Sequence, residues 1–223
     1  MTFSLIARCA KTGQFGIVIS SSSPAVAARC AHVRAGVGAV ASQNITDPAL
    51  GPLLLDALAK AQPADQALAS LTKDRQHIDY RQLLAIDAQG KTAIHSGRQV
   101  LGIWGEAQGV DCAAGGNLLA NPTIPTAMIA AFEIAKGHLG NRLIAALTAG
   151  LAAGGEAGPV HSAGMKIADK LDWPLVDLRI DWSNTPIQAL EVAWKIYRPQ
   201  MAAYVQRAKD PTQAPSYGVP GDE

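Results

Sequence analysis

Strand hairpins alternate with pairs of helices along this chain, and this order limits the folds that it can adopt. Residues 2–7 and 15–20 suit two short strands, and a turn signal lies between them. Two further hairpins are predicted at 81–95 and 162–182 by the same kind of pattern. Antiparallel strands of this kind, interleaved with helices, predict an α+β domain in which helices cover antiparallel sheet.

The remaining elements follow from runs of small or apolar residues and from their spacing. Apolar residues at helical spacing indicate two pairs of helices and one long helix near the end of the chain. Pro199 interrupts this last helix. The predicted strands outside the hairpins are 36–43 and 110–119, and the predicted helices are 53–58, 64–71, 126–136, 141–153 and 187–209. Residues 1–210 form one predicted domain, followed by a Pro- and Gly-rich tail at 211–223 that is either disordered or a strap across a neighbouring molecule.

The charge and composition exclude several classes of protein. Lys and Arg number 19 against 18 Asp and Glu, and only 17% of the residues are charged, so we expect no nucleic-acid partner. No apolar run approaches the length of a membrane span, and the first residues lack the order of a signal peptide, so we expect no membrane partner. Hydrophobic residues make up 48% of the chain, which is enough for one sizeable core.

The cysteines and histidines are not spaced for a metal or a redox centre. Cys9, Cys30 and Cys112 have no CxxC spacing and no even number to pair, which predicts reduced side chains and a cytoplasmic protein. The five histidines have no ligand spacing, so we expect no metal. The run 36–41 imitates a dinucleotide-binding fingerprint, but no helix follows it, and we expect no cofactor. A reactive Cys112 remains an alternative, which thiol reagents would inactivate.

Thr2 is the residue that most clearly suggests chemistry. Cells remove an initiator Met when the second residue is small, so we expect Thr2 to become the first residue of the mature chain. It would then carry a hydroxyl nucleophile and a free α-amino group, whose ordinary pKa of about 7.7–8.0 lets it act as a base near neutral pH. The strand at 2–7 would hold this residue in the sheet. Thr at position 2 is also common in proteins without any such role.

The opening of the chain resembles that of the N-terminal-nucleophile hydrolases. A strand that starts at Thr2, a return strand that ends in four serines, and a small-residue strand that ends at 42–44 follow the same plan. The resemblance is closer still to a bacterial family of that superfamily, termed domain of unknown function 1028, and covers nearly the whole chain. The residues that carry it are 1–4, 36–43 and 177–179, with Arg81, Gln82, Asp87, Gly90, Gly116, Asn117, Ala146, Leu147, Gly150, Gly154, Gly155 and Ser162.

The resemblance implies a four-layer αββα sandwich, in which two stacked antiparallel sheets are covered by helices. It also implies that Thr2 is the nucleophile and that the substrate is a small molecule with an amide C–N bond. Many members of the family carry an acidic-Arg-Gly stretch ahead of the serine at 162, whereas this chain reads Gly-Glu-Ala-Gly-Pro-Val-His at 155–161. The absence of that arginine implies a distinct substrate specificity.

Further site residues are assigned by analogy with the superfamily. The end of the third predicted strand lies beside the nucleophile in such folds, so Gln43 and Asn44, or their backbone amides, are predicted oxyanion donors. Asn117 is predicted to anchor the α-amine or the substrate, although an Asn here also suits a tight turn. The predicted substrate-binding residues are Ser21, Ser22, Gly116, His161 and Ser162.

Two functions therefore remain open. The first is an amidohydrolase that forms an acyl-enzyme on Thr2. The alternative is a non-catalytic small-molecule-binding or assembly protein on the same scaffold, in which a retained Met1 would cap the amine. The serines at 20–23 also suit a plain polar loop, and His161 suits an ordinary loop histidine. For either function we expect a homo-oligomer, most simply a dimer.

Overall fold

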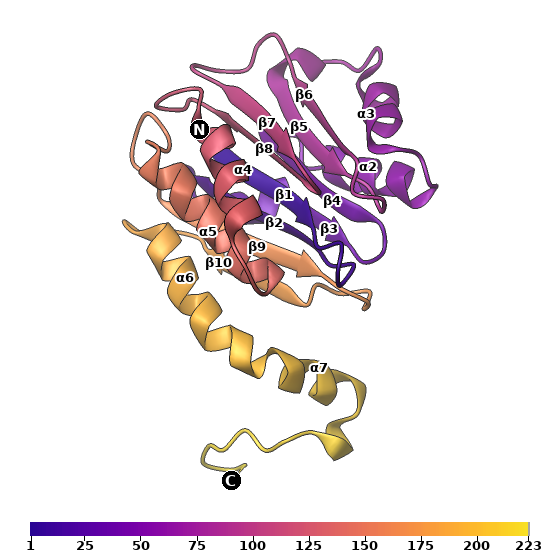
Figure 1. The fold of residues 1–223 in the computed structure, drawn as a ribbon, viewed down its shortest axis with the longest axis vertical. Coiled ribbons are helices and arrows are strands. Elements are labelled where there is room, and N and C mark those ends of the chain that lie inside the picture. Colours follow the sequence, from indigo (N-terminus) through magenta and orange to yellow (C-terminus); the bar gives the residue numbers. More distant parts are fainter. Residues whose placement is uncertain (223) are drawn as a thin grey trace.

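The computed structural model describes residues 1–222 and consists of two β-sheets with flanking helices (Figure 1). The strands are β1 (Thr2–Arg8), β2 (Phe15–Ser21), β3 (Ala31–Arg34), β4 (Gly38–Asn44), β5 (Arg81–Ile86), β6 (Thr92–Ser96), β7 (Gly105–Gly109), β8 (Cys112–Asn117), β9 (Ser162–Ala168) and β10 (Val176–Ile180). The α-helices are α1 (Val26–Cys30), α2 (Leu50–Ala59), α3 (Ala64–Thr72), α4 (Ile124–Ile134), α5 (Leu139–Ala152), α6 (Pro186–Tyr197) and α7 (Met201–Lys209). Short 3₁₀ turns lie at Ile78–Tyr80, Arg198–Gln200 and Pro211–Gln213.

The N-terminal strand lies in the interior of the larger sheet. The six-stranded sheet has the order β10-β9-β2-β1-β8-β7, and the four-stranded sheet has the order β3-β4-β5-β6. Every neighbouring pair in both sheets is antiparallel. Because β1 pairs with β2 on one side and with β8 on the other, the backbone of β1 is held along its whole length.

Three clusters of buried side chains show how the layers are stacked. Ile6, Ile17, Ile19, Leu84 and Ile86 belong to the cluster between the two sheets. The outer face of the six-stranded sheet packs against α4, α5 and α6, and that of the four-stranded sheet packs against α2 and α3 (Figure 1). The predicted α+β class with two antiparallel sheets is therefore confirmed, and helices lie against both outer faces.

Three short elements are not predicted by the sequence pattern. The alanine-rich link after the first hairpin contains α1 and β3. The strand predicted at 110–119 is observed as β8, whereas β7, which precedes it, is not predicted. The two strands form a hairpin that turns at Asp111 with a left-handed φ of 57°. β7 reads Gly-Glu-Ala-Gln-Gly, a sequence of low strand propensity that forms a sheet edge because β8 supplies its hydrogen-bond partners.

The predicted long helix near the C-terminus is interrupted where Pro199 predicts a break, at the 3₁₀ turn Arg198–Gln200 between α6 and α7. The Trp194 side chain of α6 donates a hydrogen bond of 2.7 Å to Asn141 of α5. In Figure 1, α7 extends beyond the sheets, and none of its residues is buried. The last residue of the predicted tail at 211–223 lies outside the described residues. No helix of the described part has the length and apolarity needed to cross a bilayer.

Gly38→Ala is expected to destabilise the four-stranded sheet. A Cβ at Gly38 would lie 2.2 Å from the Ile86 carbonyl oxygen, and the pairing of β4 with β5 prevents the two backbones from separating. We expect a loss of about 1–3 kcal/mol in the free energy of unfolding, measured by urea denaturation. Gly115→Ala is the matched control, because its Cβ would meet only side chains, with the nearest Leu84 atom at 3.2 Å. Equal losses in the two variants would contradict this explanation.

Candidate functional site

Four polar residues that are far apart in the sequence form a row across neighbouring strands of the six-stranded sheet. Thr2 of β1 pairs with Asn117 of β8, and Ser21 of β2 pairs with Ser162 of β9. The register of β1 with β2 joins the two pairs, because it brings Thr2 beside Ser21. Residues directly opposite each other in an antiparallel pair present their side chains on the same face. The row Asn117, Thr2, Ser21 and Ser162 therefore lies on one face of this sheet.

That face is turned toward the four-stranded sheet. Ser4, which shares the face of Thr2, donates a hydrogen bond of 2.7 Å to Gln43 Oε1 of β4. Gln43 Nε2 in turn donates to Gln82 Oε1 at 2.9 Å and to the Gly115 carbonyl at 3.2 Å. The buried Gln43 side chain thus links the two sheets, and it would have to give up these bonds to serve as an oxyanion donor.

The Asn117 side chain joins this network through only one of its two ends. Its Nδ2 donates to Gln82 Oε1 at 3.2 Å, whereas its Oδ1 has no hydrogen-bond partner although the residue is completely buried. An unpaired buried acceptor costs roughly 1–3 kcal/mol. Because Asn117 is the cross-strand neighbour of Thr2, its side chain lies on the same face of the sheet as that of Thr2.

Thr2 lines a small cavity near one end of the inter-sheet layer. It is 5% exposed, and its Oγ1 donates a hydrogen bond to the carbonyl oxygen of Met1. Ser21 Oγ donates to the same carbonyl. The cavity has a volume of about 260 Å³ and is lined by Met1, Thr2, Ser21, Ser23, Val26, Arg29, Cys30, Asn44 and Thr46. Two of the predicted site residues, Ser21 and Asn44, therefore share this cavity with Thr2.

Asn44 ends β4 in a strained backbone conformation. Its φ of 74° falls in the left-handed region, which a non-glycine residue adopts at an energetic cost. Its side-chain Nδ2 donates to the Tyr80 carbonyl at 2.6 Å, and its Oδ1 accepts from the Leu101 amide at 3.3 Å. Because both ends of the side chain are hydrogen-bonded within the protein, Asn44 would contact a ligand through its backbone.

Ser162 and Ser22 hold the loop that precedes α1. Ser162 Oγ donates to the Ser23 carbonyl at 2.6 Å and accepts from the Val26 amide at 3.2 Å. The Ser22 amide donates to both carboxylate oxygens of Glu156, at 3.0 and 3.2 Å. Since Ser23 and Val26 line the cavity, these bonds fix the shape of its wall.

Gly116 and His161, two of the predicted substrate-binding residues, do not line this cavity. A Cβ at Gly116 would lie 3.0 Å from the Thr2 carbonyl oxygen and 2.7 Å from a Leu119 methyl group. The absent side chain therefore lets β8 pack closely beside β1. The His161 ring stacks on Trp182, with the ring centroids 4.4 Å apart.

Glu156 lies beside the row, although it is not among the predicted site residues. It is 4% exposed, and burial raises the pKa of its carboxyl group to about 7, against the opposing effects of the Met1 α-amino charge and the Ser22 hydrogen bonds. Its backbone pairs with Leu119, just beyond the end of β8. The sequence carries a signal for this residue, because it is the single Asp, Glu, Lys or Arg between Arg142 and Lys166.

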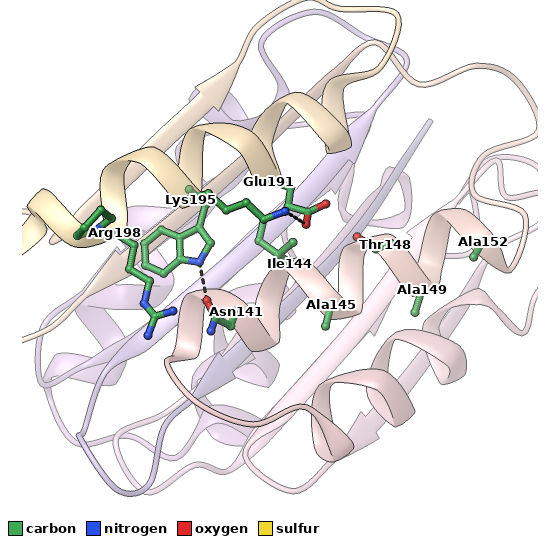
Figure 2. A pocket seen from close by; sticks show the side chains of 11 residues that line it. Asn141, Ile144, Ala145, Thr148, Ala149, Ala152, Glu191, Lys195 and Arg198 are labelled. Atoms are coloured by element: carbon green, nitrogen blue, oxygen red, sulfur yellow. Dashed lines mark hydrogen bonds and ion pairs between the residues drawn. The ribbon is translucent and has the colours of Figure 1, made fainter.

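A larger groove lies apart from this row, between α5 and α6 (Figure 2). It has a volume of about 980 Å³, and none of the predicted site residues lines it. Figure 2 shows the ion pair of Glu191 with Lys195, at 2.6 Å, beside a row of small α5 side chains. The groove is lined by Asn141, Ile144, Ala145, Thr148, Ala149, Ala152, Glu191, Trp194, Lys195, Arg198 and Pro199.

Cys112 is poorly placed for nucleophilic chemistry. It is completely buried, and this burial raises the pKa of its thiol to about 12. Such a thiol stays protonated near neutral pH, which argues against a cysteine-dependent enzyme built on Cys112. Within residues 1–222, no three His, Cys, Asp or Glu side chains are grouped so as to hold a metal ion.

The fold and the row of polar residues together define an α+β sandwich protein whose first strand delivers a hydroxyl residue to a cavity at the end of the inter-sheet layer. The chain belongs to the Family of unknown function (DUF1028), whose sequence profile matches residues 2–190. The family resemblance that the sequence motifs indicate is therefore confirmed.

Among solved structures, the chain is similar to the crystal structure of protein SPO2555 from Silicibacter pomeroyi, which is assigned to the same family. The two are 29% identical with a TM-score of 0.86, over 92% of this chain and 90% of that chain. Anbu (ancestral beta-subunit) from Yersinia bercovieri aligns at 11% identity over 91% of this chain and 97% of that chain, with a TM-score of 0.37. No curated protein sequence matches this chain.

Glu156→Gln is expected to change how stability depends on pH. Because the carboxyl pKa is about 7 in the folded chain and near 4.5 in the unfolded chain, the folded chain holds a proton between these values, and wild-type stability falls as the pH rises through this window. Glutamine does not titrate, so the variant avoids this loss. From pH 4 to pH 8, the unfolding free energy of the variant should rise relative to that of the wild type by up to about 3 kcal/mol. Urea denaturation at both pH values measures this gain, and parallel pH curves would contradict it.

Cys9 and Cys112 should differ in how fast they are alkylated. Despite partial burial, hydrogen bonds from Thr12 lower the pKa of the Cys9 thiol, whereas the Cys112 thiol is buried with a pKa of about 12. We expect iodoacetamide at pH 8 to modify Cys9 first and to leave Cys112 unmodified until urea unfolds the chain, as measured by peptide mass spectrometry. Rapid modification of Cys112 in the folded protein would contradict this prediction and would favour an enzyme that uses Cys112 as its nucleophile.

Proposed function

We propose that this protein is an amidohydrolase of the N-terminal-nucleophile type, with the αββα fold of that superfamily. In this proposal, removal of Met1 frees the α-amino group of Thr2, and Thr2 Oγ1 attacks the carbonyl carbon of a small amide. The two stacked antiparallel sheets with helices on both outer faces support the proposed fold.

The observation that carries the proposal is the unpaired Oδ1 of Asn117 opposite Thr2. A free α-amine on Thr2 would supply the donor that this buried acceptor lacks, and the resulting bond would hold the amine in one orientation. Thr2 itself is held by the pairing of β1 with its two neighbours. A nucleophile and its base would then be fixed on one residue, as this kind of catalysis requires.

Removal of Met1 has to precede folding in this proposal. Thr2 is 5% exposed, and the Met1 carbonyl accepts hydrogen bonds from Thr2 and Ser21, so the bond between residues 1 and 2 is shielded in the folded chain. The small side chain of Thr2 suits removal of Met1 during synthesis.

The reaction then proceeds in two balanced halves. The Thr2 hydroxyl oxygen bonds to the amide carbonyl carbon while its proton passes to the α-amine, directly or through water. The C–N bond of the tetrahedral intermediate breaks, and the same proton leaves with the departing amine. Water, which gives a proton to the α-amine, next attacks the ester carbonyl carbon. The bond between that carbon and Thr2 Oγ1 breaks, the oxygen takes the proton back from the amine, and a carboxylic acid is released.

Ser21 is the proposed side-chain donor to the developing oxyanion. Its Oγ already donates to a carbonyl beside Thr2, that of Met1, and accepts from the Ser23 amide at 3.0 Å, which orients the hydroxyl. The backbone amides of Gln43 and Asn44 are the further proposed donors, because the side-chain amide groups of both residues are engaged elsewhere. Loss of one such donor typically costs about 3–4 kcal/mol of barrier.

The cavity limits the size of the group that Thr2 attacks. Its volume of about 260 Å³ lies below the range of roughly 300–1,000 Å³ that is usual for drug-sized ligands. Met1 itself lines this cavity, so its removal adds the space of one residue, and the acyl half of the substrate is proposed to be no larger than an aminoacyl group.

Substitutions of Thr2 test the proposal directly. Thr2→Ala should abolish turnover, with a loss of at least about 10³-fold, because it removes the nucleophile but keeps a small second residue for Met1 removal. Thr2→Ser should keep measurable turnover, because it retains both the hydroxyl and the amine. The measurement is a screen of small amides, with mass spectrometry of the intact chain and of its N-terminal peptide to detect an acyl group on residue 2.

Thr148→Ala is the matched control, because Thr148 lines the groove between α5 and α6 and does not line the cavity at Thr2. It should behave as the wild type. Equal turnover in the Thr2→Ala variant and the wild type would remove Thr2 from the mechanism. A chain that keeps Met1 in its native host would favour the non-catalytic binding or assembly protein instead.

A further inference from the structure

Met1 is held by contacts of the kind that hold a bound ligand. Its carbonyl accepts hydrogen bonds from Thr2 and Ser21. Its side chain lies against Gly158, where a Cβ would be 3.6 Å from the Met1 methyl carbon and 3.9 Å from the sulfur. The positive charge of its α-amino group acts on the buried Glu156 carboxyl group and lowers the pKa of that group against the effect of burial. The carbonyl and the side chain of one aminoacyl unit therefore each contact a different part of the site, and its amine is near enough to Glu156 for the two charges to interact.

Glu156 is a buried carboxylate that lacks a cationic side chain. It is 4% exposed, and its carboxylate oxygens accept from the Ser22 amide. In the described part of the chain, no Lys, Arg or His forms an ion pair with it. When Met1 is removed, its α-amino charge is lost from this position, and the new α-amino group lies one residue further along the chain, at Thr2. An ammonium group on a ligand would restore an oppositely charged partner at this place.

The segment that carries Glu156 is fixed by its neighbours. The Ala120 amide donates to the Gly155 carbonyl at 3.0 Å, and the Ala157 amide donates to the Leu118 carbonyl at 2.9 Å. These bonds tie both sides of Glu156 to the chain that follows β8. The carboxylate is therefore presented from a rigid backbone, which favours a defined ligand geometry over a flexible charge contact.

We infer that the space held by Met1 is an aminoacyl subsite, and that the substrates are amides of α-amino acids with a free α-amino group and an unbranched apolar side chain. Glu156 binds the ammonium group, Ser21 the carbonyl oxygen, and the side chain lies along Gly158 in place of that of Met1. This inference rests on the proposed function, since it is the attack by Thr2 that makes this acyl position reactive.

The overall reaction is hydrolysis of the aminoacyl amide. The bond between the carbonyl carbon and the amide nitrogen breaks, water supplies the hydroxyl of the new carboxyl group and a hydrogen to the leaving nitrogen, and the products are an α-amino acid and an amine. No oxidant, reductant or further reactant is needed. An amide whose α-nitrogen is acylated would place a neutral group against Glu156 and lose the charge pairing.

The test is a binding measurement on a full chain that cannot turn the ligand over. The Thr2→Ala chain, beginning at residue 2, is obtained by cleaving a ubiquitin fusion inside the expressing cell and is verified by intact mass. Calorimetry then compares L-methioninamide with N-acetyl-L-methioninamide. We expect the free amine to bind about tenfold or more tightly than the acetylated compound, as a charge-assisted hydrogen bond implies.

Three variants in the same Thr2→Ala background, two at the proposed subsite and one control, test whether the proposed residues cause this preference. Glu156→Gln keeps an acceptor for the Ser22 amide and should reduce the preference for the free amine to about twofold or less. Glu191→Gln, on α6 beside the separate groove, is the matched control and should keep the full preference. Gly158→Leu should weaken L-methioninamide but leave glycinamide unchanged, because only the former has a side chain to place there.

Equal binding of the two compounds, absence of binding, or a preference that survives Glu156→Gln would overturn the aminoacyl subsite. The last result would follow if Glu156 served only the amine of residue 2. These outcomes are distinct from failure of the proposed function, which is decided by the acyl group on Thr2 in the wild-type chain. A persistent acyl adduct with no preference for a free amine would leave a hydrolase of other specificity, whereas amine-selective binding without any adduct would leave a binding protein.

Discussion

The pairing of β1 inside the six-stranded sheet is the constraint on which the rest of the site depends. A terminal strand at a sheet edge would fray, whereas β1 is paired with β2 on one side and with β8 on the other. This double pairing gives Thr2 a fixed place and sets its neighbours, Asn117 and Ser21, through the register alone. Backbone pairing alone therefore brings these three residues together, whatever contacts their side chains make.

The side chains between the two sheets change from apolar to polar toward this end of the layer. Isoleucine, leucine and alanine side chains fill the interior, while Ser4, Gln43, Gln82 and Asn117 carry hydrogen bonds across to the opposite sheet. Such a network requires each member to find a partner, because an unpaired amide is costly in a dry layer. Asn117 Oδ1 is left without one, and for that reason it is informative about function.

The sequence predicts the hairpins and the helix pairs because apolar periodicity and turn residues act locally, and the family follows separately from the resemblance of its motifs. It fails at β7, whose Gly-Glu-Ala-Gln-Gly sequence becomes a strand only because β8 lies beside it. It predicts Thr2, Ser21 and Asn44, which share one cavity, but also His161, which stacks on Trp182 instead. Glu156 is missed because its significance comes from burial and from the α-amino charge that acts on it. The one signal in the sequence, its place as the single charged residue between Arg142 and Lys166, shows neither property.

The two ends of the chain differ in how they can be handled in the laboratory. The first strand leads directly out of the cavity that Thr2 lines, so a purification tag left ahead of this residue would run through that cavity and cap the amine. The other end follows α7 away from both sheets, as Figure 1 shows. Recombinant protein intended for activity screens should therefore carry its tag at the C-terminus, since an inactive sample with an N-terminal tag would not test whether Thr2 is a nucleophile.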